Sequence, residues 1–117
     1  MEVVQPLDEK LRRNVSGELI RVAARSDVGP GKAIAVEVTG QRIAVFNVQG
    51  AYYAIGDICT HRGGPLSEGE VQGATVTCPW HGAQYNLQTG NVLSPPAPQD
   101  VHSYKVVIED DDIKIEI

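Results

Sequence analysis

The chain carries two short segments, Cys59-Thr60-His61-Arg62-Gly63-Gly64-Pro65-Leu66 and Cys78-Pro79-Trp80-His81-Gly82-Ala83-Gln84-Tyr85, on which its fold and chemistry depend. Both cysteines of the 117 residues and two of the three histidines lie in these segments. The metal-binding residue types follow the order Cys-x-His, sixteen residues, then Cys-x-x-His. Neither spacing requires a helix, and both suit tight loops whose side chains converge. The pattern therefore predicts one metal centre held by two loops.

Three kinds of metal site compete for these four ligands. Structural zinc accepts two cysteines and two histidines, but zinc fingers usually place both cysteines before both histidines. An all-thiolate iron–sulfur cluster needs four cysteines, and the chain has two. A mixed-ligand [2Fe-2S] cluster takes two cysteines at one iron and two histidines at the other. The ligand order favours this cluster and leaves zinc as the alternative.

Residues 18–117 are expected to form short strands separated by turns. The expected strands cover 18–24, 33–38, 41–48, 52–55, a hairpin over 70–77, 84–87, 91–93, 101–108 and 113–117. Glycine-containing turns between strands this close together indicate antiparallel hairpins. The prolines of Ser94-Pro95-Pro96-Ala97-Pro98 lack N–H donors, so this segment is expected to be a surface loop. The sequence predicts an all-β fold of small antiparallel sheets, a sandwich or barrel of hairpins.

Length and charge narrow the class of protein. The chain is long enough for one domain, and we expect this domain at 18–117, with a cluster-binding part at about 57–98 and an N-terminal extension, a tail or loosely packed arm, at 1–17. A net charge of −5 argues against nucleic-acid binding. No apolar run approaches the roughly 20 residues that cross a bilayer. The N-terminal sequence lacks the features of a secretion signal, so the expected location is cytoplasmic.

In combination, the two segments resemble those of the small soluble Rieske [2Fe-2S] ferredoxins, and the resemblance covers roughly residues 18–117. It implies a Rieske-like fold whose cluster-binding subdomain consists of two loops. It implies that Cys59 and Cys78 bind the inner iron, and that His61 and His81 bind the outer iron through Nδ1. The residues implied to surround the cluster are Gly63, Gly64, Trp80, Gly82, Ala83, Tyr85 and Pro95. The glycines would let backbone N–H groups approach the sulfurs, and Pro95 would belong to a third, covering loop.

Departures from the high-potential Rieske proteins predict a low reduction potential. Those proteins carry an extra cysteine in each loop, and Trp80 stands where the second would be. They also place a serine hydroxyl near a bridging sulfide, where this chain has Ala83. Tyr85 matches a tyrosine that donates to a ligand cysteine, although a core aromatic is an equal interpretation. Because hydrogen bonds to sulfur raise the potential, we expect a value of roughly −150 to 0 mV.

The resemblance implies a one-electron carrier that passes electrons from a flavin-dependent reductase to the terminal oxygenase of a ring-hydroxylating dioxygenase system. Both partners would dock transiently at the exposed edge formed by His61 and His81. The chain is not expected to be an enzyme alone, because the sequence shows no mononuclear-iron triad and no dinucleotide fingerprint. His102 is expected to be a surface histidine. The alternatives are a small Rieske subunit of a nitrite reductase or other multicomponent oxidoreductase, and a Cys₂His₂ zinc interaction module.

Overall fold

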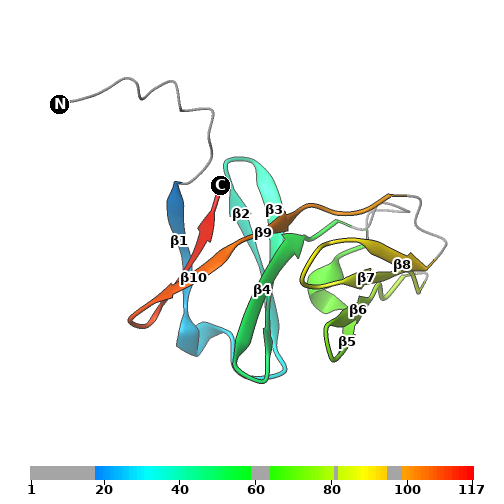
Figure 1. Ribbon diagram of the computed structural model, residues 1–117, viewed down its shortest axis with the longest axis horizontal. Coiled ribbons are helices and arrows are strands. Elements are labelled where there is room, and N and C mark those ends of the chain that lie inside the picture. Colours follow the sequence, from blue (N-terminus) through cyan, green and yellow to red (C-terminus); the bar gives the residue numbers. More distant parts are fainter. Residues whose placement is uncertain (1–17, 59–63, 81, 95–98) are drawn as a thin grey trace.

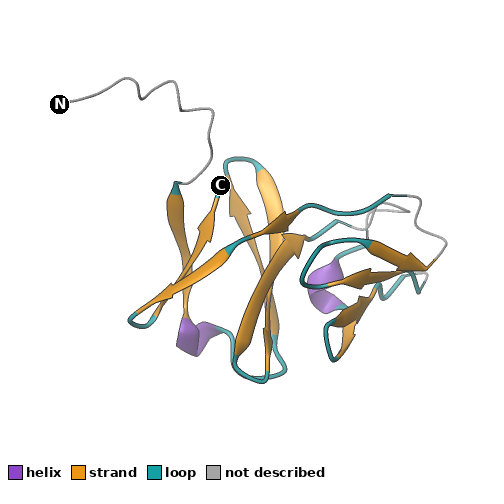
Figure 2. Cartoon of the chain, viewed as in Figure 1, coloured by secondary structure: helices purple, strands orange, loops and turns teal. Residues whose placement is uncertain are grey.

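The structure is a computed structural model that describes residues 18–58, 64–80, 82–94 and 99–117, and nearly all regular structure in these ranges is β-strand (Figure 2). The strands are β1 Leu19–Ala24, β2 Ala33–Val38, β3 Gln41–Val48, β4 Ala51–Gly56, β5 Glu70–Gln72, β6 Thr75–Thr77, β7 Gln84–Asn86, β8 Val92–Ser94, β9 Ser103–Tyr104, β10 Val106–Glu109 and β11 Asp112–Glu116. Two single turns of 3₁₀ helix, η2 Arg25–Asp27 and η3 Leu66–Glu68, interrupt them. The all-β prediction is confirmed. The expected N-terminal extension lies outside the described residues.

The strands form three small antiparallel sheets, ordered β1-β11-β10, β2-β3-β4-β9 and β5-β6-β7-β8. The sheet of β2, β3, β4 and β9 lies between the other two, with β1 and β10 on one side and β5–β8 on the other (Figure 1). Strand β11 joins the C-terminal part of the chain to β1, pairing Leu19 with Glu116 and Ala24 with Asp112. The first sheet therefore pairs a strand near the start of the described residues with a strand near their end.

Strand β3 supplies side chains to two separate hydrophobic clusters, one on each face of the middle sheet. Successive side chains of a strand point to opposite faces. Accordingly Ile43 and Val45 pack in the cluster that contains Ile113 and Ile115, facing the first sheet. On the other face, Ala44 and Phe46 pack in the cluster that continues into η3 and the β5–β8 sheet, with Leu66, Val76, Cys78, Ala83, Tyr85, Leu87 and Val101. The middle sheet is therefore buried on both faces, and its second face leads directly to the predicted metal segments.

Two tight turns fix the register of the middle sheet. Thr39 and Gly40 have φ of +49° and +84°, and Gln49 and Gly50 have φ of +54° and +93°. Each two-residue turn with both φ positive matches the right-handed twist of the strands that it joins. Both turns lie where the sequence predicted hairpins, and Val38 pairs with Gln41 across the first.

The strand expected over 101–108 is wrong in one respect, because the structure divides it at Lys105. Tyr104 pairs with Ala54 of β4, whereas Val106 pairs with Ile115 of β11. The segment therefore leaves the middle sheet and enters the first one. A single continuous strand could pair with only one of the two sheets. The division lets β9 pair with β4 while β10 pairs with β11.

Candidate metal centre

The first predicted metal segment begins and ends at a closed base. Strand β4 ends at Gly56, and Ile58 forms an antiparallel bridge with Pro65. The Leu66 N–H donates to the Asp57 carbonyl at 2.7 Å, so the chain returns to its starting point. Cys59, His61 and Gly63 lie between these positions, outside the described residues. The base of this loop, formed by Ile58 and Pro65, therefore lies just after the end of β4.

The second segment forms the tight connection between β6 and β7. The Cys78 N–H donates to the Ala83 carbonyl at 2.7 Å, and the Gly82 N–H donates to the Cys78 carbonyl at 3.1 Å. Gly82 has φ of +80°, a region that residues with a Cβ rarely adopt. His81 lies outside the described residues. The loop folds so that its first residue, Cys78, is almost fully buried.

The two segments meet at Gly64. A Cβ on this residue would lie 2.9 Å from the Cys78 Sγ and 2.9 Å from the Trp80 Cγ. The absence of a side chain at Gly64 therefore lets the first loop lie directly against the thiol of the second. This contact brings together a residue beside the expected ligands Cys59 and His61 and the expected ligand Cys78.

The residues that surround Cys78 are buried, whereas Trp80 in the same loop is exposed. The Cys78 side chain is 2% exposed, and Ala83 and Tyr85 are fully buried in the same hydrophobic cluster. Trp80 is 56% exposed although its ring contacts the Gly64 position. Trp80 is among the residues implied to surround the cluster, and the structure gives it both a packed face and a face in solvent. Tyr85 has the core position that one of its two interpretations required.

The predicted third loop is also held at its base. The Val92 N–H donates to an Asp100 carboxylate oxygen at 2.7 Å, and the Val101 N–H donates to the Gly90 carbonyl at 2.8 Å. Pro95 lies between these positions and outside the described residues. His102, the third histidine, is exposed, and its ring lies 4.6 Å from that of Tyr104. It takes no part in the contacts between the two metal segments described above, in agreement with the expectation of a surface histidine.

Sequence reasoning missed Asp57 and its partner Arg42. Asp57 is fully buried, and its carboxylate accepts hydrogen bonds from Arg42 and from the Ser67 N–H. A signal was present, since an acidic residue stands two positions before the first expected ligand. Nothing in the spacing indicates a partner fifteen residues earlier. The contact follows from the end of β4 lying beside the start of β3.

The described residues fit a metal group held between the two loops. A buried thiol faces a residue of the opposite loop with no side chain between them. Among the described residues there is no cluster of three or more His, Cys, Asp or Glu side chains that would bind a metal ion. Three of the four expected ligands, Cys59, His61 and His81, fall outside that part of the chain. No described helix is long and apolar enough to cross a membrane.

Comparisons with known proteins identify the family. Residues 18–105 match the family model described as the Rieske [2Fe-2S] domain. The 3-phenylpropionate/cinnamic acid dioxygenase ferredoxin subunit of Escherichia coli (strain K12) is 42% identical over 93 residues, which cover 79% of this chain and 87% of that protein. The Sphingomonas yanoikuyae B1 ferredoxin superposes with a TM-score of 0.79 at 29% identity, over 86% of this chain and 99% of that one. A chain of the complex of reduced oxygenase and oxidized ferredoxin in carbazole 1,9a-dioxygenase superposes with a TM-score of 0.76 at 33% identity, over 83% and 91%. The chain therefore belongs to the Rieske [2Fe-2S] family, among the ferredoxins similar to those of dioxygenase systems.

Proposed function

We propose that this chain is the ferredoxin of a multicomponent dioxygenase system, which carries single electrons from a flavin-dependent reductase to a terminal oxygenase. The observation that carries the proposal is the 42% sequence identity between this chain and a dioxygenase ferredoxin subunit, over most of both chains. Family membership excludes the zinc alternative, because the family holds a [2Fe-2S] cluster. Such a cluster gains and loses one electron without bond rearrangement in the protein. The chain supplies its binding site and the surface that a partner meets.

The proposed ligands are Cys59 and Cys78 for one iron and His61 and His81 for the other. The contact between Gly64 and the Cys78 Sγ supports this set, because it brings the two motif segments together from opposite sides. A Rieske centre requires one cysteine and one histidine from each of two loops. The buried residues around Cys78 and Tyr85 exclude water from the part of the site that holds the cysteine ligands. The electron would therefore enter and leave through the proposed histidine ligands.

The proposed docking surface surrounds His61 and His81 and includes Pro65 and the proline loop. Two large apolar side chains of this end support it, since Ile58 is 51% exposed and Trp80 is 56% exposed. Ile58 pairs with Pro65, and Trp80 contacts Gly64, so the four residues are contiguous. Exposed apolar groups that adjoin one another mark interaction sites, and electron-transfer interfaces are small and transient. One surface would serve the reductase and the oxygenase in turn.

We also propose that residues 18–117 form one domain whose cluster-binding part is 57–98, and that 1–17 are an extension to it. Strand β3 contributes to both hydrophobic clusters, which supports a single unit. The expected cytoplasmic location stays a prediction, which fractionation of the source cells tests.

Reconstitution with purified partners tests the proposed function. The reduced protein should give the EPR spectrum of a mixed-ligand [2Fe-2S] centre, and redox titration should place its potential at roughly −150 to 0 mV. NADH should reduce it only when a flavin reductase is present, and an oxygenase should turn over only when the ferredoxin is added. A value above about +200 mV would overturn the low-potential assignment. Co-purification in a stable stoichiometric complex would instead favour the subunit of a nitrite reductase or another multicomponent oxidoreductase.

A further inference from the structure

Asp57 is a buried carboxylate directly before the 58–65 segment, which contains the expected ligands Cys59 and His61. It follows β4, and its side chain has no exposed surface. The described residues contain only one other polar residue in the buried class, Asn47. Burying a charge is costly unless it is paired and hydrogen-bonded. A fully buried carboxylate at this position therefore calls for an account of its partners.

The carboxylate of Asp57 joins two other segments of the chain. Its Oδ2 accepts hydrogen bonds from Arg42 Nε at 3.2 Å and from Arg42 Nη2 at 2.9 Å. Its Oδ1 accepts a hydrogen bond from the Ser67 N–H at 2.7 Å. The main chain repeats both links, since the Asp57 N–H donates to the Arg42 carbonyl at 3.0 Å and the Leu66 N–H donates to the Asp57 carbonyl at 2.7 Å. One residue thus connects the start of β3, the end of β4 and η3.

These contacts hold the two ends of the 58–65 segment. Asp57 lies immediately before it, and Leu66 and Ser67 lie immediately after it. Hydrogen bonds to an ionised carboxylate are stronger than those between neutral groups. Both ends of the segment are therefore tied to a single side chain, which is in turn tied to the middle sheet through Arg42.

The fold does not need this link to define its sheets. Strands β3 and β4 are already paired over six positions, from Ile43 with Gly56 to Val48 with Ala51. Leu66, the first residue of η3, is buried in the hydrophobic cluster that contains Phe46 and Cys78. The carboxylate contributes where that pairing has ended, at the point where the ligand segment begins. Its position suits a role in the geometry of the metal site.

We propose that Asp57 is a positioning residue for the cluster, which holds the two ends of the 58–65 segment in place through an ion pair between its buried carboxylate and the half-exposed guanidinium of Arg42. The proposal rests on the proposed assignment of Cys59 and His61 as ligands. Residues that orient the ligands of a metal typically change metal affinity by 10–100-fold when they are replaced. Asp57 acts through the segment and is not itself a ligand.

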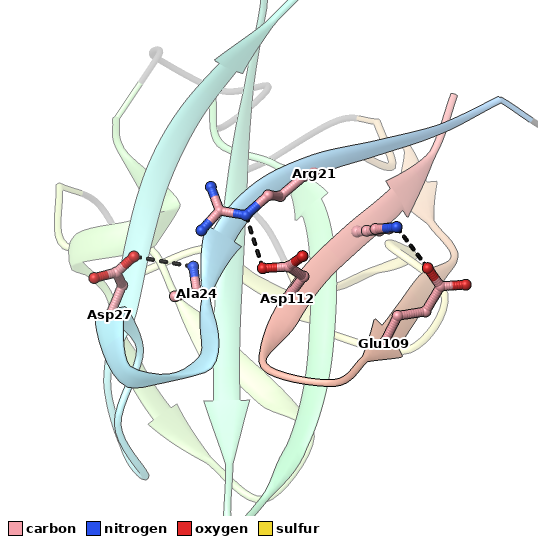
Figure 3. A network of polar contacts seen from close by, with 6 residues as sticks. Arg21, Ala24, Asp27, Glu109 and Asp112 are labelled. Atoms are coloured by element: carbon pink, nitrogen blue, oxygen red, sulfur yellow. Dashed lines mark hydrogen bonds and ion pairs between the residues drawn. The ribbon is translucent and has the colours of Figure 1, made fainter.

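Two variants test this role by removing the ion pair from either side. Asp57→Asn keeps an oxygen for the Ser67 N–H but removes the charge that faces Arg42. Arg42→Gln removes the guanidinium and leaves the Ser67 contact in place. The matched control is Asp112→Asn, which removes the ion pair of Asp112 Oδ1 with Arg21 Nε at 2.8 Å. That pair joins β1 to β11 in the first sheet (Figure 3), which lies across the middle sheet from β5–β8 (Figure 1).

The measurements are iron per chain, the rate of iron loss to a chelator, and the EPR spectrum of the reduced fraction that keeps its cluster. We expect both variants to lose iron about tenfold faster or more, and their retained clusters to show shifted or broadened EPR lines. Asp112→Asn should match the wild type in all three. A role in folding alone would lower the yield of folded protein but leave the EPR lines of the retained cluster unchanged, and that result would overturn the proposal.

Measurements on the wild-type protein distinguish a failure of the positioning role from a failure of the ligand assignment. If it binds a cluster with the expected EPR spectrum and both variants behave like it, the positioning role is wrong and the ligand assignment stands. If the wild type assembles no mixed-ligand cluster, the ligand assignment fails and the positioning role fails with it.

Discussion

Replacing Gly64 by alanine should weaken cluster binding, and the structure gives the size of the effect. The added Cβ would lie 2.9 Å from the Cys78 Sγ, 2.9 Å from the Trp80 Cγ and 3.0 Å from its Cδ2. Non-bonded carbon atoms prefer about 3.5–4.0 Å, so each approach is too close by about 0.5 Å or more. Trp80 is largely in solvent and can turn away. The Cys78 thiol is enclosed, and it has to move.

The cost falls on the metal site because the displaced atom is a proposed ligand. Overpacking a close-packed site costs about 1–3 kcal/mol. Each 1.4 kcal/mol is a factor of ten in an equilibrium constant, so the affinity for the cluster should fall about 5- to 150-fold. The loss is measured as the concentration of an iron chelator that removes half of the visible absorption of the oxidised protein. Chemical unfolding of the same sample reports the stability of the fold separately.

Gly29→Ala is the matched control for this experiment. Its Cβ would meet only the Lys32 Cγ at 3.8 Å, an ordinary contact, and Gly29 has no positive φ. It should change stability by no more than about 0.5 kcal/mol and leave the chelator midpoint unaltered. If Gly64→Ala keeps its cluster as firmly as Gly29→Ala does, the two loops do not meet as described and the reasoning is refuted.

Three further predictions concern the potential and the docking surface. Ala83→Ser places a hydroxyl in a fully buried position that is proposed to adjoin the iron–sulfur cluster; a hydrogen bond from this hydroxyl to a sulfur should raise the potential, and a redox titration that shows no rise contradicts the prediction. Trp80→Ala should raise the KM for the oxygenase about fivefold or more by removing an apolar anchor, with no change expected for Ile108→Ala, a partly exposed side chain on β10 in the sheet away from the cluster. The potential should fall at alkaline pH, because oxidation makes the metal more positive and favours proton loss from His61 and His81; a potential that stays flat from neutral to strongly alkaline pH argues against histidine ligation.

The hairpins were predictable because their determinants are local. The turns at Thr39-Gly40 and Gln49-Gly50 combine glycine with alternating apolar residues on both sides, and the strands lie where this pattern places them. The pairing of β1 with β11 was not predictable in the same way, since nothing in either sequence specifies a partner about ninety residues away. Local signals fix strands, and tertiary contacts decide which strands meet.

The candidate site divides along the same line. The residue types and their order predicted the ligand set, since only certain side chains bind iron, and this set stays a prediction because Cys59, His61 and His81 lie outside the described residues. The contacts that support the set come from other parts of the chain, as Arg42 on β3 and Val101 before β9 illustrate. The expected role of Gly64 was close approach of its backbone, and the close contact with Cys78 agrees with the need for glycine there.

The supporting frame explains why a small fold suffices for this site. Leu66, Cys78, Ala83 and Val101, which lie at or beside the bases of the three loops, belong to one hydrophobic cluster that is built on Phe46 of the middle sheet. Close-packed interiors resist displacement, so loops that share a core keep their relative positions. A site that changes only by one electron gains from ligands that stay in place, because any movement adds to the barrier for transfer. A change that loosens this shared core, such as Phe46→Ala, should therefore disturb all three loops at once, whereas a change in the Asp57 pair should affect the first loop alone.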